Sequence, residues 1–367
     1  MDGAEDSAEA LHPTIDARQG QVVDVFLIAP GRLDGRPVSF SESGGRGVTS
    51  WSASGCPAAT IEWRRVGPTM SHVSTPAPNR SISIYANAVV FGPRHGTWIG
   101  YDRVEYAETP VFKGDAGSAT NASASPRVRA GGWVLAMKSA EPAQPSARQR
   151  ATNVLLFGVM RLSAQISLGS DVFATPGAAD APKGQIADDV FRFTFRQGDD
   201  LLGWLTTYFN VPYLFGSAGK GAKSQAERYI GADCADVLVA ALRRAGNRSL
   251  EYSSVMALME HLKRVGPTVE IRPCESAGPC QQTGTALRFG PDVRPGDLLA
   301  LDYIDVADLP RPFDHIVALV ADRGPAGTAD GVLGPEDLVA DSGSAEGLKF
   351  APLSGQGPVR VAVLRTK

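Results

Sequence analysis

The 367-residue sequence predicts an all-β region followed by an α+β domain. In the first half, short alternating or β-branched runs are separated by clusters of Gly, Pro, Ser and Asn, a pattern typical of strands joined by turns. In the second half, apolar residues recur at helical spacing in some segments and form short strand-like runs in others. We therefore divide the chain into residues 1–190 and residues 191–367.

The first region contains six runs that we expect to be strands, at residues 22–28, 60–66, 82–91, 97–106, 133–137 and 154–166. Together they predict a sandwich or barrel-like domain. Residues 139–150, rich in Pro, Ala and Ser, are expected to form an excursion between strands, and residues 175–184 a linker. This region could target the protein or shape the cleft of the domain that follows.

The second region is expected to place three helices against an antiparallel sheet. The helices are expected at residues 199–209, from Cys234 onward, and at 254–265, and the strands at 298–302, 315–321, 338–341 and 359–364. Short strands interleaved with helices of this length predict an α+β arrangement.

Cys234 is the first candidate for chemistry because it directly precedes an apolar pattern of helical period that ends near Gly246. A thiol at a helix N-terminus is stabilised as the thiolate by unpaired backbone N–H groups and the helix dipole, so its pKa is expected to be lowered. The alternative is a small buried residue at the start of a core helix, since free Cys is often buried.

A nucleophilic thiol requires a base and a group that orients the base. His315 opens the apolar run His-Ile-Val-Ala-Leu-Val, and Asp341 ends a later strand. Asp314 competes as the orienting group, but adjacent side chains of a strand point to opposite faces. Ser342 would point away in the same manner and is a weaker acceptor than a carboxylate. We therefore predict a Cys234–His315–Asp341 triad.

The order of short motifs from residue 199 to residue 367 resembles the NlpC/P60 family of papain-like cysteine peptidases. The matching residues are Pro212, Tyr213, Gly216, Gly231, Asp233, Cys234, Pro295, Gly296, Asp297, Leu298, His315 and Asp341. The resemblance implies a papain-like α+β domain and hydrolysis of an amide bond in bacterial cell-wall stem peptides. Three positions depart from the family pattern: Cys234-Ala235-Asp236 replaces Cys-Ser-Gly, and Asp341 stands where a His or a neutral amide is common.

The oxyanion and substrate are expected to meet Tyr213, Asp233 and Asp236 beside the backbone N–H of Cys234. The Tyr213 assignment follows from the family resemblance, and a half-buried aromatic residue is its alternative. Asp236 suits the positive end of a helix but could repel a thiolate or change which substrate group is accepted nearby.

Two other functions remain open for the second region. The same thiol could serve an acyltransferase or an amidase acting on another amide substrate, or the domain could be a degenerate, non-catalytic binding module. The expected partner is a peptidoglycan peptide or another amide. Formal net charge is −3 with no basic block, so nucleic acid is not an expected partner.

No cofactor or metal is predicted. None of the histidines has metal-ligand spacing, and the glycine-rich residues 216–224 lack the order of a phosphate-binding loop. We expect a solvated loop there, in which Lys220 and Lys223 would border the cleft and could meet an anionic substrate.

Localisation is expected to be secreted, periplasmic or otherwise in the cell envelope, with a cytoplasmic location left open. No run approaches eighteen apolar residues, so no transmembrane segment is predicted, and the first residues do not form an export signal. Cys274 and Cys280 bracket a short loop and are either a disulfide of an oxidising compartment or two free thiols. Cys56 has no evident partner.

Overall fold

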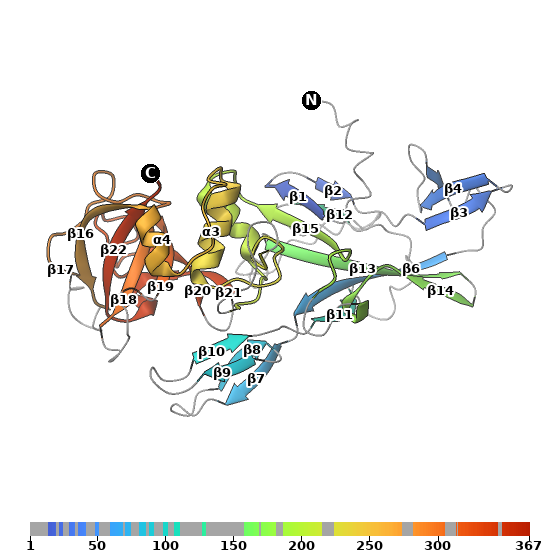
Figure 1. Cartoon of the computed structure of the whole chain (residues 1–367), viewed down its shortest axis with the longest axis horizontal. Helices are drawn as coiled ribbons and strands as arrows, with labels where there is room; N and C mark the ends of the chain where they lie inside the picture. The colour runs from blue at the N-terminus through green and yellow to red at the C-terminus, as the bar shows by residue number, and fades with distance from the viewer. Residues whose placement is uncertain are drawn as a thin grey trace. The chain divides into compact units, whose positions relative to one another are not determined.

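The computed structural model divides the chain into two compact units, Met1–Thr69 with Glu105–Arg196 and Met70–Val104 with Gln197–Lys367. Figure 1 labels most of their helices and strands. The residues that the structure describes are 14–19, 22–24, 29–33, 36–41, 48–50, 59–68, 70–74, 81–85, 88–91, 98–101, 106–110, 127–129, 158–168, 170–180, 186–214, 224–273, 282–304, 313, 315–343 and 347–367.

The main sheet of the first unit has the strand order β1-β15-β13-β6-β11, with β14 paired to β13 (Figure 1). Its strands are β1 (Thr14–Arg18), β6 (Ala59–Pro68), β11 (Tyr106–Pro110), β13 (Gly158–Leu168), β14 (Asp171–Ala174) and β15 (Phe191–Arg196). β1 and β15 run parallel, and the other pairs are antiparallel. The rings of Phe193 and Phe195 are buried and contact each other edge to face.

The remaining strands of the amino-terminal half form smaller sheets. They are formed by β2 (Val22–Asp24) with β12 (Arg127–Arg129), by β3 (Ala29–Leu33), β4 (Arg36–Ser41) and β5 (Val48–Ser50), by β7 (Met70–Ser74) with β8 (Ser81–Tyr85), and by β9 (Ala88–Phe91) with β10 (Trp98–Tyr101).

The prediction of strands in this half is confirmed, because every predicted run within the described residues coincides at least in part with a strand. The run 133–137 and the excursion 139–150 lie outside the described residues. The described part of the expected linker contains one 3₁₀ turn, η4 (Ala178–Asp180).

Three short α-helices lie in the described part of the second unit. They are α2 (Leu201–Leu205), continued by the 3₁₀ helix η5 (Thr206–Tyr208), α3 (Cys234–Arg244) and α4 (Val255–His261). Each begins at a capping side chain, because Asp200, Asp233 and Ser254 accept hydrogen bonds from N–H groups of the first turn.

A seven-stranded antiparallel sheet dominates this unit, with the order β17-β16-β22-β18-β19-β20-β21 (Figure 1). The strands are β16 (Lys263–Ile271), β17 (Gln282–Thr283), β18 (Leu298–Tyr303), β19 (His315–Ala321), β20 (Leu338–Gly343), β21 (Gly347–Pro352) and β22 (Val359–Arg365). The four strands predicted from the sequence are therefore confirmed as β18, β19, β20 and β22.

The predicted α+β papain-like NlpC/P60 fold is wrong, because the described structure is mostly β-sheet with few helices. The helix expected at 254–265 ends at His261, and β16 begins two residues later. Gly266 and Pro267 disfavour a helix there, whereas Val265, Thr268 and their β-branched neighbours favour a strand that pairs with β22.

The sheet buries different side chains on its two faces. One face packs large aliphatic residues, including Leu299, Val317 and Val361, into one buried cluster. Val339 belongs to this cluster, so its neighbour Ala340 points to the other face, because successive side chains of a strand point to opposite faces. Phe350 pairs with Ala340, and its ring lies 5.2 Å from that of Phe209, so the segment that follows α2 and η5 lies on this second face.

The Pro-Gly-Asp turn before β18 is held by an ion pair with the last strand. Gly296 adopts a φ of 91°, which favours glycine. The Asp297 carboxylate is 1 % exposed and accepts hydrogen bonds from the Arg294 N–H at 2.9 Å and from Arg365 Nε and Nη2 at 2.6 and 2.7 Å. This bidentate pair ties the start of β18 to the end of β22.

We predict that Asp297→Ala lowers the free energy of unfolding by about 2 to 3 kcal/mol. This loss is smaller than the ~3 to 5 kcal/mol of a fully buried pair, because Arg365 remains partly exposed. Asp302→Ala is the matched control, since Asp302 pairs with the exposed Arg360 across the same two strands and should contribute less than about 1 kcal/mol. Chemical unfolding of both variants measures the difference, and equal losses would contradict the assignment.

Candidate active site

The two sequence motifs around the candidate thiol pair directly with each other. Tyr213 and Ala232 form a parallel bridge, in which the Leu214 N–H donates to the Ala232 carbonyl and the Ala232 N–H to the Pro212 carbonyl, each at 3.2 Å. Gly231 is required at this crossing, because a Cβ there would lie 2.6 Å from the Leu214 side chain. The pairing fixes Tyr213 beside the start of α3.

Cys234 is the first residue of α3 and its side chain is mostly buried. Asp233 caps the helix: its Oδ1 accepts hydrogen bonds from the Ala235 and Asp236 N–H groups at 3.0 and 2.9 Å. Asp233 therefore lies beside Cys234 as the helix cap. Asp236 lies in the first turn of α3, and its side chain is buried. The cap fixes the direction in which α3 presents the thiol.

His315 and Asp341 lie on neighbouring strands, β19 and β20. Ala318 pairs with Ala340, so odd-numbered residues of both strands share one face at this point. His315 Nε2 lies 2.7 Å from Asp341 Oδ1, and both side chains are nearly inaccessible to solvent. The carboxylate therefore fixes the ring orientation of His315.

Cys234 lies close enough to His315 to interact with its ring, and this interaction raises the pKa of His315. Because Nε2 is engaged with Asp341, Nδ1 is the nitrogen that remains for the thiol. Burial lowers the pKa of His315, but interactions with Tyr303 and Cys234 and the bond to Asp341 outweigh it, so the pKa lies well above its usual value. The structure thus assembles all three predicted residues into one contact chain.

Asp341 remains a carboxylate in spite of its burial. Burial raises the pKa of this group, but hydrogen bonds from His315 and Gln356, together with the charge of Lys349, lower the pKa below its usual value. A charged Asp341 stabilises a positive imidazole, which is the form that results when His315 takes the thiol proton.

Two tyrosines line this group. Burial raises the pKa of Tyr213 far above its usual value, and the proximity of Cys234 and Asp233 raises it further, so its hydroxyl keeps its proton and can donate. The Tyr303 ring stacks on His315 with 6.2 Å between ring centroids. Tyr303 was not predicted as a site residue.

Gln356 is a second site residue that the sequence did not indicate. It ends the 3₁₀ helix η7 (Leu353–Gln356), and its Nε2 donates to Asp341 Oδ2 at 2.9 Å. Its Oε1 accepts a hydrogen bond from the Tyr303 hydroxyl at 3.1 Å. No local motif marks Gln356, because only the pairing of β20 with β21 brings η7 back to Asp341.

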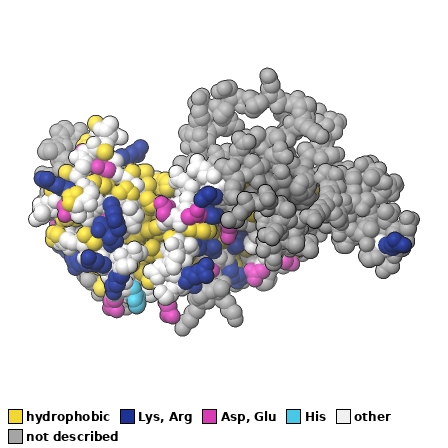
Figure 2. Space-filling view, turned by 90° about the horizontal axis from the view of Figure 1, so that it is seen from above, with side chains coloured by type: hydrophobic (Ala, Val, Ile, Leu, Met, Phe, Trp, Pro, Cys, Tyr) yellow, Lys and Arg dark blue, Asp and Glu magenta, His cyan; other side chains and the backbone are white. Residues whose placement is uncertain are grey.

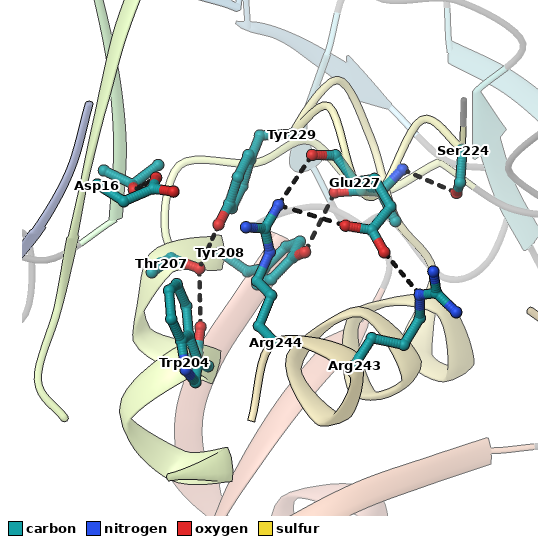
Figure 3. A network of polar contacts seen from close by, with 11 residues as sticks. Asp16, Trp204, Thr207, Tyr208, Ser224, Glu227, Tyr229, Arg243 and Arg244 are labelled. Carbon is teal, nitrogen blue, oxygen red and sulfur yellow. Dashed lines mark hydrogen bonds and ion pairs between the residues drawn. The ribbon is translucent and has the colours of Figure 1, made fainter. Parts of the chain in front are cut away.

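A separate polar network braces α3 at its other end (Figure 3). Arg243 Nε lies 2.7 Å from Glu227 Oε1, and Arg244 Nη2 lies 3.0 Å from the Glu227 carbonyl oxygen. The Arg244 guanidinium also lies over the ring of Tyr229, 4.7 Å from its centroid. The segment that leads into Cys234 is thereby attached to the last turn of the same helix.

The structure does not describe several residues that were singled out in the sequence. Lys220, Lys223, Asp314, Cys56, Cys274 and Cys280 lie outside the described residues. Within the described ranges, no group of His, Cys, Asp and Glu side chains is arranged to hold a metal ion, and no helix is long and apolar enough to cross a membrane. On the face shown in Figure 2, the basic and acidic side chains of the described residues are interspersed.

Comparison of the chain with protein-family models, with curated proteins and with solved structures found no match.

We predict that the stabilising effect of Asp341 depends on pH. The raised pKa of His315 means that the folded state binds its proton more tightly than the unfolded state, so this stabilisation is complete below about 6.5, the unfolded value, and is lost as the pH rises through the folded pKa. Asp341→Asn should therefore lower the free energy of unfolding by about 3 kcal/mol at a pH of about 5.5, and by clearly less at a pH of about 10.

Chemical unfolding of the wild type and of Asp341→Asn at both pH values measures this difference. Lys349→Gln is the control on the neighbouring strand, since Lys349 is exposed and its charge lowers the pKa of Asp341. An Asp341→Asn penalty that stays constant or grows with rising pH would show that no charged imidazole is paired with Asp341.

Proposed function

We propose that the chain is a cysteine peptidase or amidase that hydrolyses an amide bond through an acyl-enzyme. One observation carries the proposal: the His315 ring contacts the Cys234 side chain on one side and the Asp341 carboxylate on the other. A nucleophile, a base and an orienting carboxylate in series form the arrangement of thiol and serine hydrolases on several unrelated folds.

The reaction follows from these contacts. His315 Nδ1 takes the thiol proton, and Cys234 Sγ attacks the amide carbonyl carbon to form a C–S bond. When the tetrahedral intermediate collapses, the C–N bond breaks, and the imidazolium returns the proton to the leaving amine. Water then attacks the thioester with His315 as base, which releases the carboxylic acid and restores the thiol.

Negative charge develops on the carbonyl oxygen during both formation and hydrolysis of the acyl-enzyme, and hydrogen-bond donors must stabilise it. Asp233 accepts the N–H groups of Ala235 and Asp236, and we assign the N–H of Cys234 to the oxyanion. The Tyr213 hydroxyl is held beside the thiol and keeps its proton, so it supplies a second donor. The dipole of α3 favours the negative charge at the same point.

The substrate that we propose is an amide of a bacterial cell-wall stem peptide, and the proposed location is the cell envelope. Support for both comes from the sequence motifs around Cys234, Asp297 and His315, which resemble those of NlpC/P60 peptidases. The Gly231 and Tyr213 positions of those motifs have a structural purpose here, because they set the crossing beside α3.

Peptidoglycan fragments of defined stem composition test the proposal. The wild type should release free amine and carboxylic acid from an internal stem amide, and Cys234→Ala should reduce the rate by about 10⁴-fold or more, as removal of a nucleophile does in related machinery. His315→Ala should cause a loss of similar size, because the thiol then has no base. His261→Ala serves as the histidine control: His261 is exposed at the end of α4, and its replacement should leave the rate unchanged.

Product analysis with and without an added amine separates hydrolysis from acyl transfer. Formation of a new amide at the expense of the acid would identify an acyltransferase. A complete absence of turnover, together with a Cys234 thiol that does not react with iodoacetamide below a pH of about 8.5, would contradict the catalytic proposal and favour a binding domain.

A further inference from the structure

The side chain of Gln356 makes two hydrogen bonds that require its amide to face one way. Asp341 Oδ2 is a carboxylate oxygen and can only accept, so the Gln356 nitrogen must face it, at 2.9 Å. The Gln356 oxygen then faces the Tyr303 hydroxyl, which donates to it at 3.1 Å. A glutamine meets both demands at once, and neither a carboxylate nor an apolar side chain of the same length does.

These contacts close a ring around the base. His315 bonds to Asp341 Oδ1, Asp341 Oδ2 to Gln356, and Gln356 to Tyr303. The Tyr303 ring then stacks on His315, which returns to the starting point. The members come from β18, β19, β20 and η7, so the ring connects four separate segments of the chain.

Asp341 needs a second partner because it is a buried carboxylate. A single hydrogen bond to His315 leaves the other oxygen able to rotate, and the carboxylate then no longer defines the plane of the imidazole. The groups that face Asp341 are His315 from β19, Lys349 from β21, Gln356 from η7 and Tyr213 from the segment before α3. Of these, Gln356 holds Oδ2 through a neutral amide.

We propose that Gln356 is a positioning residue that fixes the Asp341 carboxylate and, through it, the ring of His315. This inference rests on the proposed function, since it concerns the base of the same thiol site. Gln356 is bonded to Asp341 and Tyr303 rather than to the thiol, so it acts on the reaction through Asp341.

The rate of Cys234 alkylation by iodoacetamide tests this role, followed between pH values of about 5 and 8 by mass spectrometry of the peptide that contains Cys234. Alkylation forms an S–C bond and expels iodide, so its rate reports how well His315 removes the thiol proton. The groups facing His315 are Cys234 from α3, Tyr303 from β18 and Asp341 from β20. Gln356→Met should slow alkylation about three- to tenfold near a pH of about 6, since it removes the bond to a charged group.

Gln356→Glu keeps the shape of the side chain and gives a sharper signature. At a pH of about 7.5 its carboxylate repels Asp341, and the rate should fall further than in Gln356→Met. At a pH of about 5 a protonated Gln356→Glu side chain can again donate to Asp341, so the deficit should shrink. A purely structural role of Gln356 would give deficits that do not depend on pH.

Three further variants complete the test. Ser354 lies in the same 3₁₀ helix as Gln356, and Ser354→Ala should be alkylated at the wild-type rate at every pH. Tyr303→Phe keeps the stacked ring but removes the hydroxyl, so it should slow alkylation by less than Gln356→Met does. The variant that combines Tyr303→Phe with Gln356→Met should be slowed by less than the product of the two single effects.

The outcomes separate the two proposals. If wild-type Cys234 reacts as an ordinary thiol whether or not His315 is replaced by Ala, the proposed function fails and the positioning role fails with it. If the wild type is activated and His315-dependent but Gln356→Met and Gln356→Glu both match it, Gln356 has no positioning role and the proposed function stands. A pH-dependent loss in Gln356→Glu supports both.

Discussion

The register of β20 between its two neighbours is the constraint on which the candidate site depends. Pairing of Ala318 with Ala340 places His315 and Asp341 on one face, within hydrogen-bond distance. Pairing of β20 with β21 returns the chain so that η7 follows directly, with Gln356 at its end. A slip of one residue in β20 would turn Asp341 to the opposite face and remove the orienting group of the base together with the support for that group.

Burial gives this register its chemical effect. A carboxylate withdrawn from water loses hydration and tends to take up a proton unless other groups replace the water. Around Asp341 two groups take the place of water: the imidazole of His315, which can become charged, and the amide of Gln356, which cannot. The charge of Asp341 is thereby kept next to His315, where it favours the imidazolium, at a position that solvent reaches poorly.

The sequence was sufficient for features that depend on local chemistry, namely the start of α3 at Cys234 and the strand that His315 opens. The predicted fold class was wrong partly because the start of β16 was assigned to a helix, and its pairing with β22 is a long-range interaction that no short window displays. Gln356 and Tyr303 escaped prediction for a related reason, since neither stands in a motif and their contacts join residues 53 and 15 positions apart. The three residues of the triad were thus accessible from sequence, and Gln356 and Tyr303, which support them, were not.

The error in fold class does not weaken the case for the thiol site, because catalytic arrangements of this kind are defined by geometry and recur on unrelated folds. What the site requires of its fold is a helix N-terminus brought to the end of two paired strands and held there. Here, Glu227 fixes the far end of that helix through Arg243 and Arg244, and the bridge between Tyr213 and Ala232 fixes the near end. With both ends of α3 attached, the position of its first residue relative to the base is set by the fold and does not depend on a bound substrate.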